Sequence, residues 1–336
     1  MPQNIASTFR LSLLIAFLGL IWCNIQALAN DDKAKTDKPK MLMVTQSAGF
    51  RHSPVKRGEQ LISPAEKTMK KLAQTTGLFE VDFTQDVATH LTRENLQNYD
   101  IVVFYTSGNL PIAKDDLRYL LEEWVKQPGH GFLGFHSASD TYKEHQPYWD
   151  FIGGTFDGHP WGANSNVTIK VHDPAHPAMK PFGNEFQIRD EIYQYVNWQP
   201  ENVRVLMSLD MEKTEKKRPY HVPVAWVKQI GEGRMYYNNL GHRNDTWENT
   251  QFQKSIVGAI RWIIGEDSGD ASPNPEVSQQ QHDHSVRYAH AAGITKESLA
   301  AEKRANEARK KARQAKKQAE AGKKQTESEN RSDKSD

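Results

Sequence analysis

Three histidines of this chain stand directly after segments that are expected to form strands. They are His52, His136 and His242, each within a short stretch of polar and small residues. The carboxyl ends of parallel strands meet at one edge of a sheet, which is where α/β proteins bind their ligands. We therefore expect the three imidazoles to converge on one crevice, although they lie far apart in the sequence.

A fourth histidine and a carboxylate are further candidates for chemistry. His159 lies in a loop rich in turn residues, and Glu191 belongs to a pair of acidic residues. Such a set can transfer protons or bind sugar hydroxyls, and it can also hold zinc or manganese. We predict His136, His159 and Glu191 as catalytic residues. For a divalent metal the predicted ligands are His136, His159 and His242, although no close ligand spacing marks a metal site.

Side chains for substrate binding are expected around the same crevice. The candidates are His52, Arg51, Tyr142, Trp161 and His242. For the two aromatic residues, stacking on a sugar ring competes with a place in the hydrophobic core. The sequence leaves both interpretations open.

Several familiar mechanisms lack their motifs in this chain. No Gly-x-Gly-x-x-Gly follows the first expected strand, and neither a phosphate-binding loop nor a Gly-x-Ser-x-Gly elbow is present. Cys23 is the single cysteine, and it lies in the N-terminal leader. After removal of that leader the chain would have no thiolate nucleophile and no disulfide.

Apolar runs and amphipathic stretches alternate along the chain and indicate the fold class. Strands are expected at 41–45, 79–83, 100–105, 131–136, 167–171, 203–209, 223–230 and 234–238. Helices are expected at 59–74, 115–126 and 247–264. Strands that alternate with helices predict βαβ units and a mostly parallel sheet. The expected fold is α/β.

Both ends of the chain differ from this middle part. Residues 1–29 combine Arg10, an apolar run and Ala27-Leu28-Ala29, the order of a signal peptide. About a dozen apolar residues are too few to span a membrane. We therefore expect an exported protein, periplasmic or secreted, with no membrane span after cleavage, and a linker at 30–39.

Beyond residue 265 the composition becomes polar. We expect a second linker at 266–295 and a charged tail at 296–336, helical by propensity or disordered. A formal net charge of +1 gives no overall attraction to nucleic acid. Assembly as a homo-oligomer stays open.

Five short elements between Gly49 and His242 resemble the trehalose-utilisation (ThuA-like) family. They are Gly49-Phe50-Arg51-His52-Ser53, Gly134-Phe135-His136, Gly153-Gly154-Thr155-Phe156 with His159-Pro160, Asp190-Glu191-Ile192-Tyr193, and Gly231-Glu232-Gly233-Arg234 with Leu240-Gly241-His242. The resemblance covers residues 40–265. It implies the class I glutamine amidotransferase-like fold, a flavodoxin-like three-layer sandwich.

The resemblance also bears on function. Amidotransferases of this fold carry a nucleophilic cysteine on the turn where this chain has His136, so glutaminase activity is not expected. The family implies carbohydrate utilisation, with a disaccharide or its 3-keto derivative as the substrate. The alternative is a non-catalytic sugar-binding protein that uses the same crevice.

Overall fold

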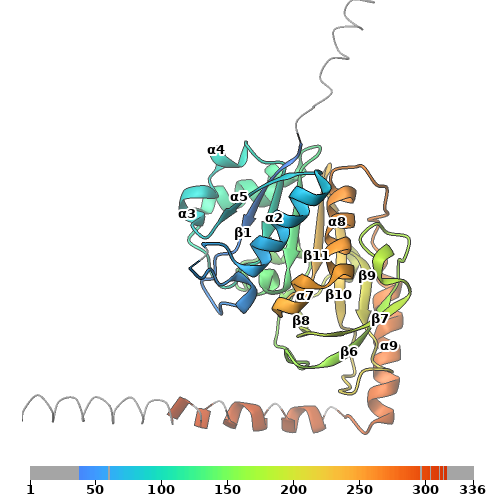
Figure 1. Cartoon of the computed structure of the whole chain (residues 1–336). Coiled ribbons are helices and arrows are strands. Elements are labelled where there is room, and N and C mark those ends of the chain that lie inside the picture. Colours follow the sequence, from blue (N-terminus) through green and yellow to red (C-terminus); the bar gives the residue numbers. More distant parts are fainter. Residues whose placement is uncertain are drawn as a thin grey trace, which may run out of the picture.

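A nine-stranded sheet forms the centre of the protein (Figure 1). The computed structural model describes residues 38–59, 61–295, 297–302, 304–309, 311–312 and 314–315. The expected leader at 1–29 lies outside these residues, as does the linker at 30–39 except for its last two positions. Within the described part of the chain, no helix is both long enough and apolar enough to cross a membrane.

Five parallel strands and four antiparallel strands make up the sheet. In spatial order they are β2 (Glu80–Thr84), β1 (Lys40–Val44), β3 (Ile101–Phe104), β4 (Gly131–Phe135), β11 (Gly233–Asn238), β10 (Pro223–Ile230), β9 (Arg204–Leu209), β6 (Asn166–Val171) and β7 (Glu185–Arg189). Pairing is parallel from β2 to β11 and antiparallel from β11 to β7. Since β9 and β7 again point the same way as β11, most strands share one direction.

Helices cover both faces of this sheet and create three layers (Figure 1). They are α2 (Pro64–Thr76), α3 (Val87–His90), α4 (Arg93–Leu96), α5 (Lys114–Glu122), α6 (Gln146–Ile152), α7 (Asn244–Glu248), α8 (Thr250–Ile263) and α9 (Pro275–Ala291). A small second sheet pairs β5 (Thr155–Phe156) with β8 (Tyr195–Val196). The predicted flavodoxin-like α/β sandwich with a mostly parallel sheet is confirmed.

The position of strand β1 between two hydrophobic cores explains why its sequence is apolar without alternation. Met41 and Met43 belong to one hydrophobic core, beneath α2 and α8. Leu42 and Val44 belong to the other core, beneath α5 and α6. All four side chains are at least 98% buried, and each such burial contributes about 1.5–3 kcal/mol relative to exposure. The strand is thus fixed in register from both sides.

Helix α9 corrects the expectation of a linker at 266–295. Residues 275–291 form a helix that buries Ser278, Gln281, Ser285 and Ala289. Because these residues are polar or small, the helix has no apolar stripe from which it could be recognised. Asn274, just before α9, bonds the backbone of Val205 in β9 through both its side-chain oxygen and its side-chain nitrogen. The helix is therefore attached to the domain.

Candidate functional site

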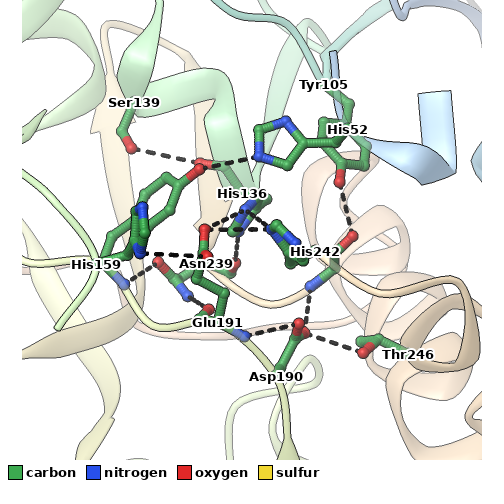
Figure 2. A network of polar contacts seen from close by, with 12 residues as sticks. His52, Tyr105, His136, Ser139, His159, Asp190, Glu191, Asn239, His242 and Thr246 are labelled. Atoms are coloured by element: carbon green, nitrogen blue, oxygen red, sulfur yellow. Dashed lines mark hydrogen bonds and ion pairs between the residues drawn. The ribbon is translucent and has the colours of Figure 1, made fainter. Parts of the chain in front are cut away.

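The three predicted strand-end histidines meet at the carboxyl edge of the parallel strands (Figure 2). His52 follows β1, His136 follows β4 directly, and His242 follows β11. The ring centroids of His52 and His136 are 4.7 Å apart, those of His52 and His242 5.0 Å, and those of His136 and His242 5.1 Å. The fold therefore brings together residues that are up to 190 positions apart in the sequence.

Glu191 places its carboxylate among these imidazoles. It lies between β7 and β8, and its residue is only 6% exposed. Oε1 is 3.2 Å from His242 Nδ1 and 3.6 Å from His136 Nε2, while Oε2 is 3.4 Å from His159 Nδ1. Burial alone would raise the pKa of Glu191, but the adjacent imidazoles of His136 and His242 outweigh burial and hold the pKa well below its usual range. The carboxylate is therefore ionised.

His136 occupies a strained turn at the end of β4. Its φ is +43°, a value that residues other than glycine rarely adopt. Its Nδ1 donates to the backbone oxygen of Asn239 at 2.7 Å. That bond leaves the Nε2 lone pair of the neutral ring directed at His242 Nδ1, 3.2 Å away. A histidine fixed in this way is poised to bind a cation or a proton through Nε2.

A buried ion pair holds the loop that carries His52. Glu66 at the start of α2 accepts hydrogen bonds from Arg57 at 2.8–3.1 Å and from the Thr45 hydroxyl at 2.5 Å.

His52 itself is 3% exposed, and its Nε2 lies 3.3 Å from the Tyr193 hydroxyl. Its Nδ1 has no hydrogen-bond partner among the described residues. Burial lowers the pKa of His52 to about 2, so the ring is neutral.

Asp190 positions the residues on either side of the cluster. Its Oδ2 accepts the Gly241 N–H at 2.7 Å and the Thr246 hydroxyl at 3.0 Å, and its Oδ1 accepts the Glu191 N–H at 2.9 Å. Gly241 has a φ of +121°, which a side chain would strain. Burial raises the pKa of the Asp190 carboxyl. One buried side chain thus sets the backbone before His242 and at Glu191.

The distances within the cluster fit a small divalent cation. One ligand atom from each of His52, His136, Glu191 and His242 lies within 4.8 Å of all the others. Two ligands about 2.1 Å from a tetrahedral zinc ion are about 3.4 Å apart. The pairs given above, at 3.2, 3.2 and 3.6 Å, match that spacing. Three imidazoles and one carboxylate are also ligands that zinc and manganese accept.

This ligand set differs from the predicted one. His52 and Glu191 belong to it, whereas His159 lies outside it and contacts Glu191 from the other side. The His159 side chain is 53% exposed and stacks on Phe156. It therefore stands at the mouth of the site, where it can move and exchange protons.

Two of the predicted substrate-binding aromatics lie in the core. Tyr142 is 8% exposed and donates to the backbone oxygen of Leu110. Trp161 is 1% exposed and donates to the backbone oxygen of Lys216. Their packing removes them from the sugar-stacking role that the sequence left open. Arg51 is exposed beside the cluster.

Other side chains around the cluster were not predicted from the sequence. Phe50 is 66% exposed and packs edge-on against His52 at 4.8 Å, which gives the rim an accessible aromatic ring. Asn239 is fully buried, accepts the Tyr193 N–H and donates to the Glu191 carbonyl. Asn239 could have been found from the sequence because it is a polar residue at the end of a strand. For Phe50 the only sequence signal was its position in the Gly-Phe-Arg-His element.

Two cavities are lined by histidines that contact Glu191. The first, of about 450 Å³, is lined by His242, Arg243 and Asp245 among others. The second, of about 560 Å³, begins at His159. Each cavity thus reaches the site through one histidine, and His242 and His159 contact different oxygens of Glu191.

Fold and site together define an α/β protein with a histidine and carboxylate centre at the carboxyl edge of its sheet. The sequence model of the ThuA family, described as trehalose utilisation, matches residues 40–263. The chain therefore belongs to that family. No curated protein matches the sequence.

Two solved structures support the fold. A ThuA-like protein from Bacteroides uniformis is 22% identical, with a TM-score of 0.53 over 73% of this chain and 98% of that one. A ThuA-like protein from Parabacteroides merdae is 15% identical, with a TM-score of 0.52 over 71% of this chain and 99% of that one.

Proposed function

We propose that this chain is an exported, divalent-metal enzyme that acts on a disaccharide or its 3-keto derivative. The observation that carries the proposal is the cluster of His52, His136, Glu191 and His242, whose ligand atoms lie within 4.8 Å of one another. Export rests on the signal-like leader at 1–29. The sugar rests on membership of the trehalose-utilisation family, on the exposed Phe50 ring and on the paired cavities.

A bound cation would balance the negative charge and satisfy the buried polar atoms of the cluster. The His136 ring donates through Nδ1, so its Nε2 brings a lone pair to the cluster, and Glu191 adds a negative charge. His52 adds a third imidazole, which is buried and offers one ligand atom within 4.8 Å of the others. Buried polar groups are nearly always satisfied, and zinc or manganese would satisfy several of these at once.

His159 is the residue placed for proton transfer. When bound, a divalent cation would polarise a keto or hydroxyl oxygen of the sugar. His159 can then take the proton from the carbon next to the keto group, while the C–H electron pair moves toward the keto oxygen. Glu191 holds His159 Nδ1 at 3.4 Å, which turns the other ring nitrogen outward. In this proposal His159 is the general acid/base. The metal ligands are His52, His136, Glu191 and His242.

The experiment begins with the protein purified without chelators and without a polyhistidine tag. N-terminal sequencing should give Asn30 as the first residue, and elemental analysis should find about one zinc or manganese ion per chain. His136→Ala and Glu191→Gln should lose that metal, whereas His145→Ala, which removes an exposed imidazole, should keep it. His159→Ala should keep the metal but lose most turnover of a 3-keto disaccharide, by roughly 100-fold or more.

Two other outcomes would decide against the enzyme. A chain that takes up no metal after incubation with zinc and manganese would exclude the proposed centre. Tight binding of a disaccharide that is never converted, equally strong in the His159→Ala variant, would instead favour the sugar-binding alternative. A first residue other than Asn30, with the leader retained, would argue against export by cleavage.

A further inference from the structure

A buried arginine, Arg218, lines the same cavity as His159. The Arg218 side chain is 8% exposed. Its Nη1 donates to the Lys217 carbonyl at 3.0 Å, and its Nη2 donates to both carboxylate oxygens of Glu302, at 2.7 and 2.9 Å. Lys216 Nζ is 3.6 Å from the same carboxylate. Two cations thus share one carboxylate.

That carboxylate comes from outside the part of the chain that matches the family. Glu302 lies 84 residues after Arg218 and beyond the family match, which ends at residue 263. Among the described residues, Glu302 is the carboxylate within ion-pair distance of Arg218. A guanidinium that is buried without a carboxylate is unfavourable. The domain proper therefore presents a cation that needs an anion from elsewhere.

The C-terminal helical segment, residues 297–302 and 304–309, is mostly exposed. In Figure 1 this segment follows α9 and runs beneath β6 and β8. Among its described residues, Leu299 and Glu302 are half-buried and the others are exposed. An exposed helix without an apolar stripe gains little from docking. The Glu302 ion pair is thus a contact with the domain that a competing anion could replace.

The cavity joins this ion pair to the candidate active site. It holds about 560 Å³ between the domain and the C-terminal helical segment. Its lining includes His159, which contacts Glu191, and also Arg218 and Glu302. Its wall is polar, since Gln194 bonds the Asp157 carbonyl and accepts the Tyr220 hydroxyl. A sugar bound at His159 could extend along this wall to Arg218.

We propose that Arg218 and Lys216 form an anion subsite of the substrate crevice. It takes an anionic group on a sugar, the carboxylate of a uronic acid or the phosphate of a sugar phosphate. Planar guanidinium groups bind both in bidentate fashion. Glu302 occupies the subsite while the C-terminal helical segment is docked and leaves when the anionic sugar enters. The identification of the ligand as a sugar rests on the proposed function above, whereas the preference for an anion does not.

The test measures binding by calorimetry with the full chain and needs no turnover. The probes are glucuronate, its neutral amide glucuronamide, glucose 6-phosphate and glucose. The wild-type chain should bind at least one anionic probe more tightly than both neutral probes. Glu302→Gln should strengthen that binding roughly tenfold, because the competing carboxylate is gone, and should leave the neutral probes unchanged. Glu94→Gln, the same change at an exposed position in α4, should have no effect.

Variants on the domain side complete the test. Arg218→Gln should abolish the preference for the anion. If that variant fails to fold, Lys216→Gln, at a side chain that is 42% exposed, should reduce the preference severalfold. Preference for glucuronate identifies a carboxylate, and preference for glucose 6-phosphate a phosphate. An unchanged affinity in Glu302→Gln overturns the subsite, as does equal binding of charged and neutral probes or no binding at all. Binding of neutral sugars without an anion preference would leave the proposed function intact.

Discussion

At the scale of single residues, the site depends on atoms that hold other atoms in place. Asn239 supplies the backbone oxygen that orients His136, and its side chain supports Tyr193 and Glu191. Asp190 links the backbone of Glu191 to that of Gly241, next to His242. Neither Asn239 nor Asp190 belongs to the ligand set, so their effect on chemistry is through position.

Asp190→Asn should therefore weaken metal binding without removing a ligand. Asparagine has one acceptor oxygen and one donor nitrogen, so it cannot accept the Gly241, Thr246 and Glu191 hydrogen bonds together. Loss of residues that orient ligands commonly costs about 10–100-fold in metal affinity. Competition with a fluorescent zinc chelator should show a drop of at least about tenfold.

A neighbouring aspartate provides the control for this experiment. Asp245 is about half exposed and pairs with Arg243 and Arg189 at the surface. Asp245→Asn makes the same chemical change in α7, at a side chain outside the ligand set, and should leave the zinc affinity unchanged. Equal affinities for Asp190→Asn and the wild type would show that Asp190 does not position the ligands.

The sequence predicts the members of the site better than their roles. Polar residues at strand ends, together with the parallel sheet, were enough to bring His52, His136 and His242 together. The pattern could not show that Glu191 lies between them, because Glu191 comes from a loop whose path depends on tertiary contacts. It also could not separate a core aromatic such as Trp161 from a ligand-binding one, since both are apolar residues near a turn.

At the scale of elements, the parallel half of the fold was predictable and the periphery less so. Strands β1, β3 and β4 are continuous apolar runs because both faces are covered. Strand β7 was not predicted, since it lies at the sheet edge and has a mixed sequence. Helix α9 was missed because its buried side is made of serine, glutamine and alanine, which hydrophobic periodicity does not detect.

Asn274 gives a test of whether α9 is part of the folding unit. Its side chain accepts the Val205 N–H at 2.7 Å and donates to the Val205 carbonyl at 3.1 Å. Asn274→Ala leaves both buried backbone groups without these partners, at about 1–3 kcal/mol each. Urea unfolding should show a loss of roughly 2–5 kcal/mol in the free energy of unfolding. Asn98→Ala, at an exposed turn, should change it by less than about 0.5 kcal/mol.

At the scale of the whole molecule, the site lies where the parallel strands end and loops from the antiparallel part cover them. His52 and His136 come from the parallel half, and Glu191 comes from the connection after β7. The seam between the halves therefore creates the crevice. Three further histidines away from the site are buried or half-buried: His172, His176 and His221.

These three histidines should make the stability of the whole molecule sensitive to acid. Burial lowers the pKa of His172 and His176 to about 4 and that of His221 to about 3. In the unfolded chain each would titrate near 6.5. Between these values the unfolded chain binds more protons, so the free energy of unfolding falls as the pH drops below 6.5. Each histidine should account for up to about 2 kcal/mol between pH 7 and pH 5.

Urea unfolding at pH 7 and pH 5 measures this loss, and His176 isolates one contribution to it. Its Nδ1 accepts the Ala178 N–H at 3.3 Å, and its Nε2 has no partner among the described residues. Protonation would break that bond inside the core. His176→Gln should lower stability at pH 7 but should lose up to about 2 kcal/mol less than the wild type on going to pH 5.

The buried carboxyls of Asp140 and Asp190, whose pKa values burial raises, act in the opposite direction and reduce the total without changing this difference. His145→Gln removes an exposed imidazole, whose hydration scarcely changes on folding, and serves as the control. Equal pH dependence in the His176→Gln variant and the wild type would show that His176 is not a source of the acid sensitivity. In that case the folded protein would bind a proton at His176 as readily as the unfolded chain does, despite the burial of the ring.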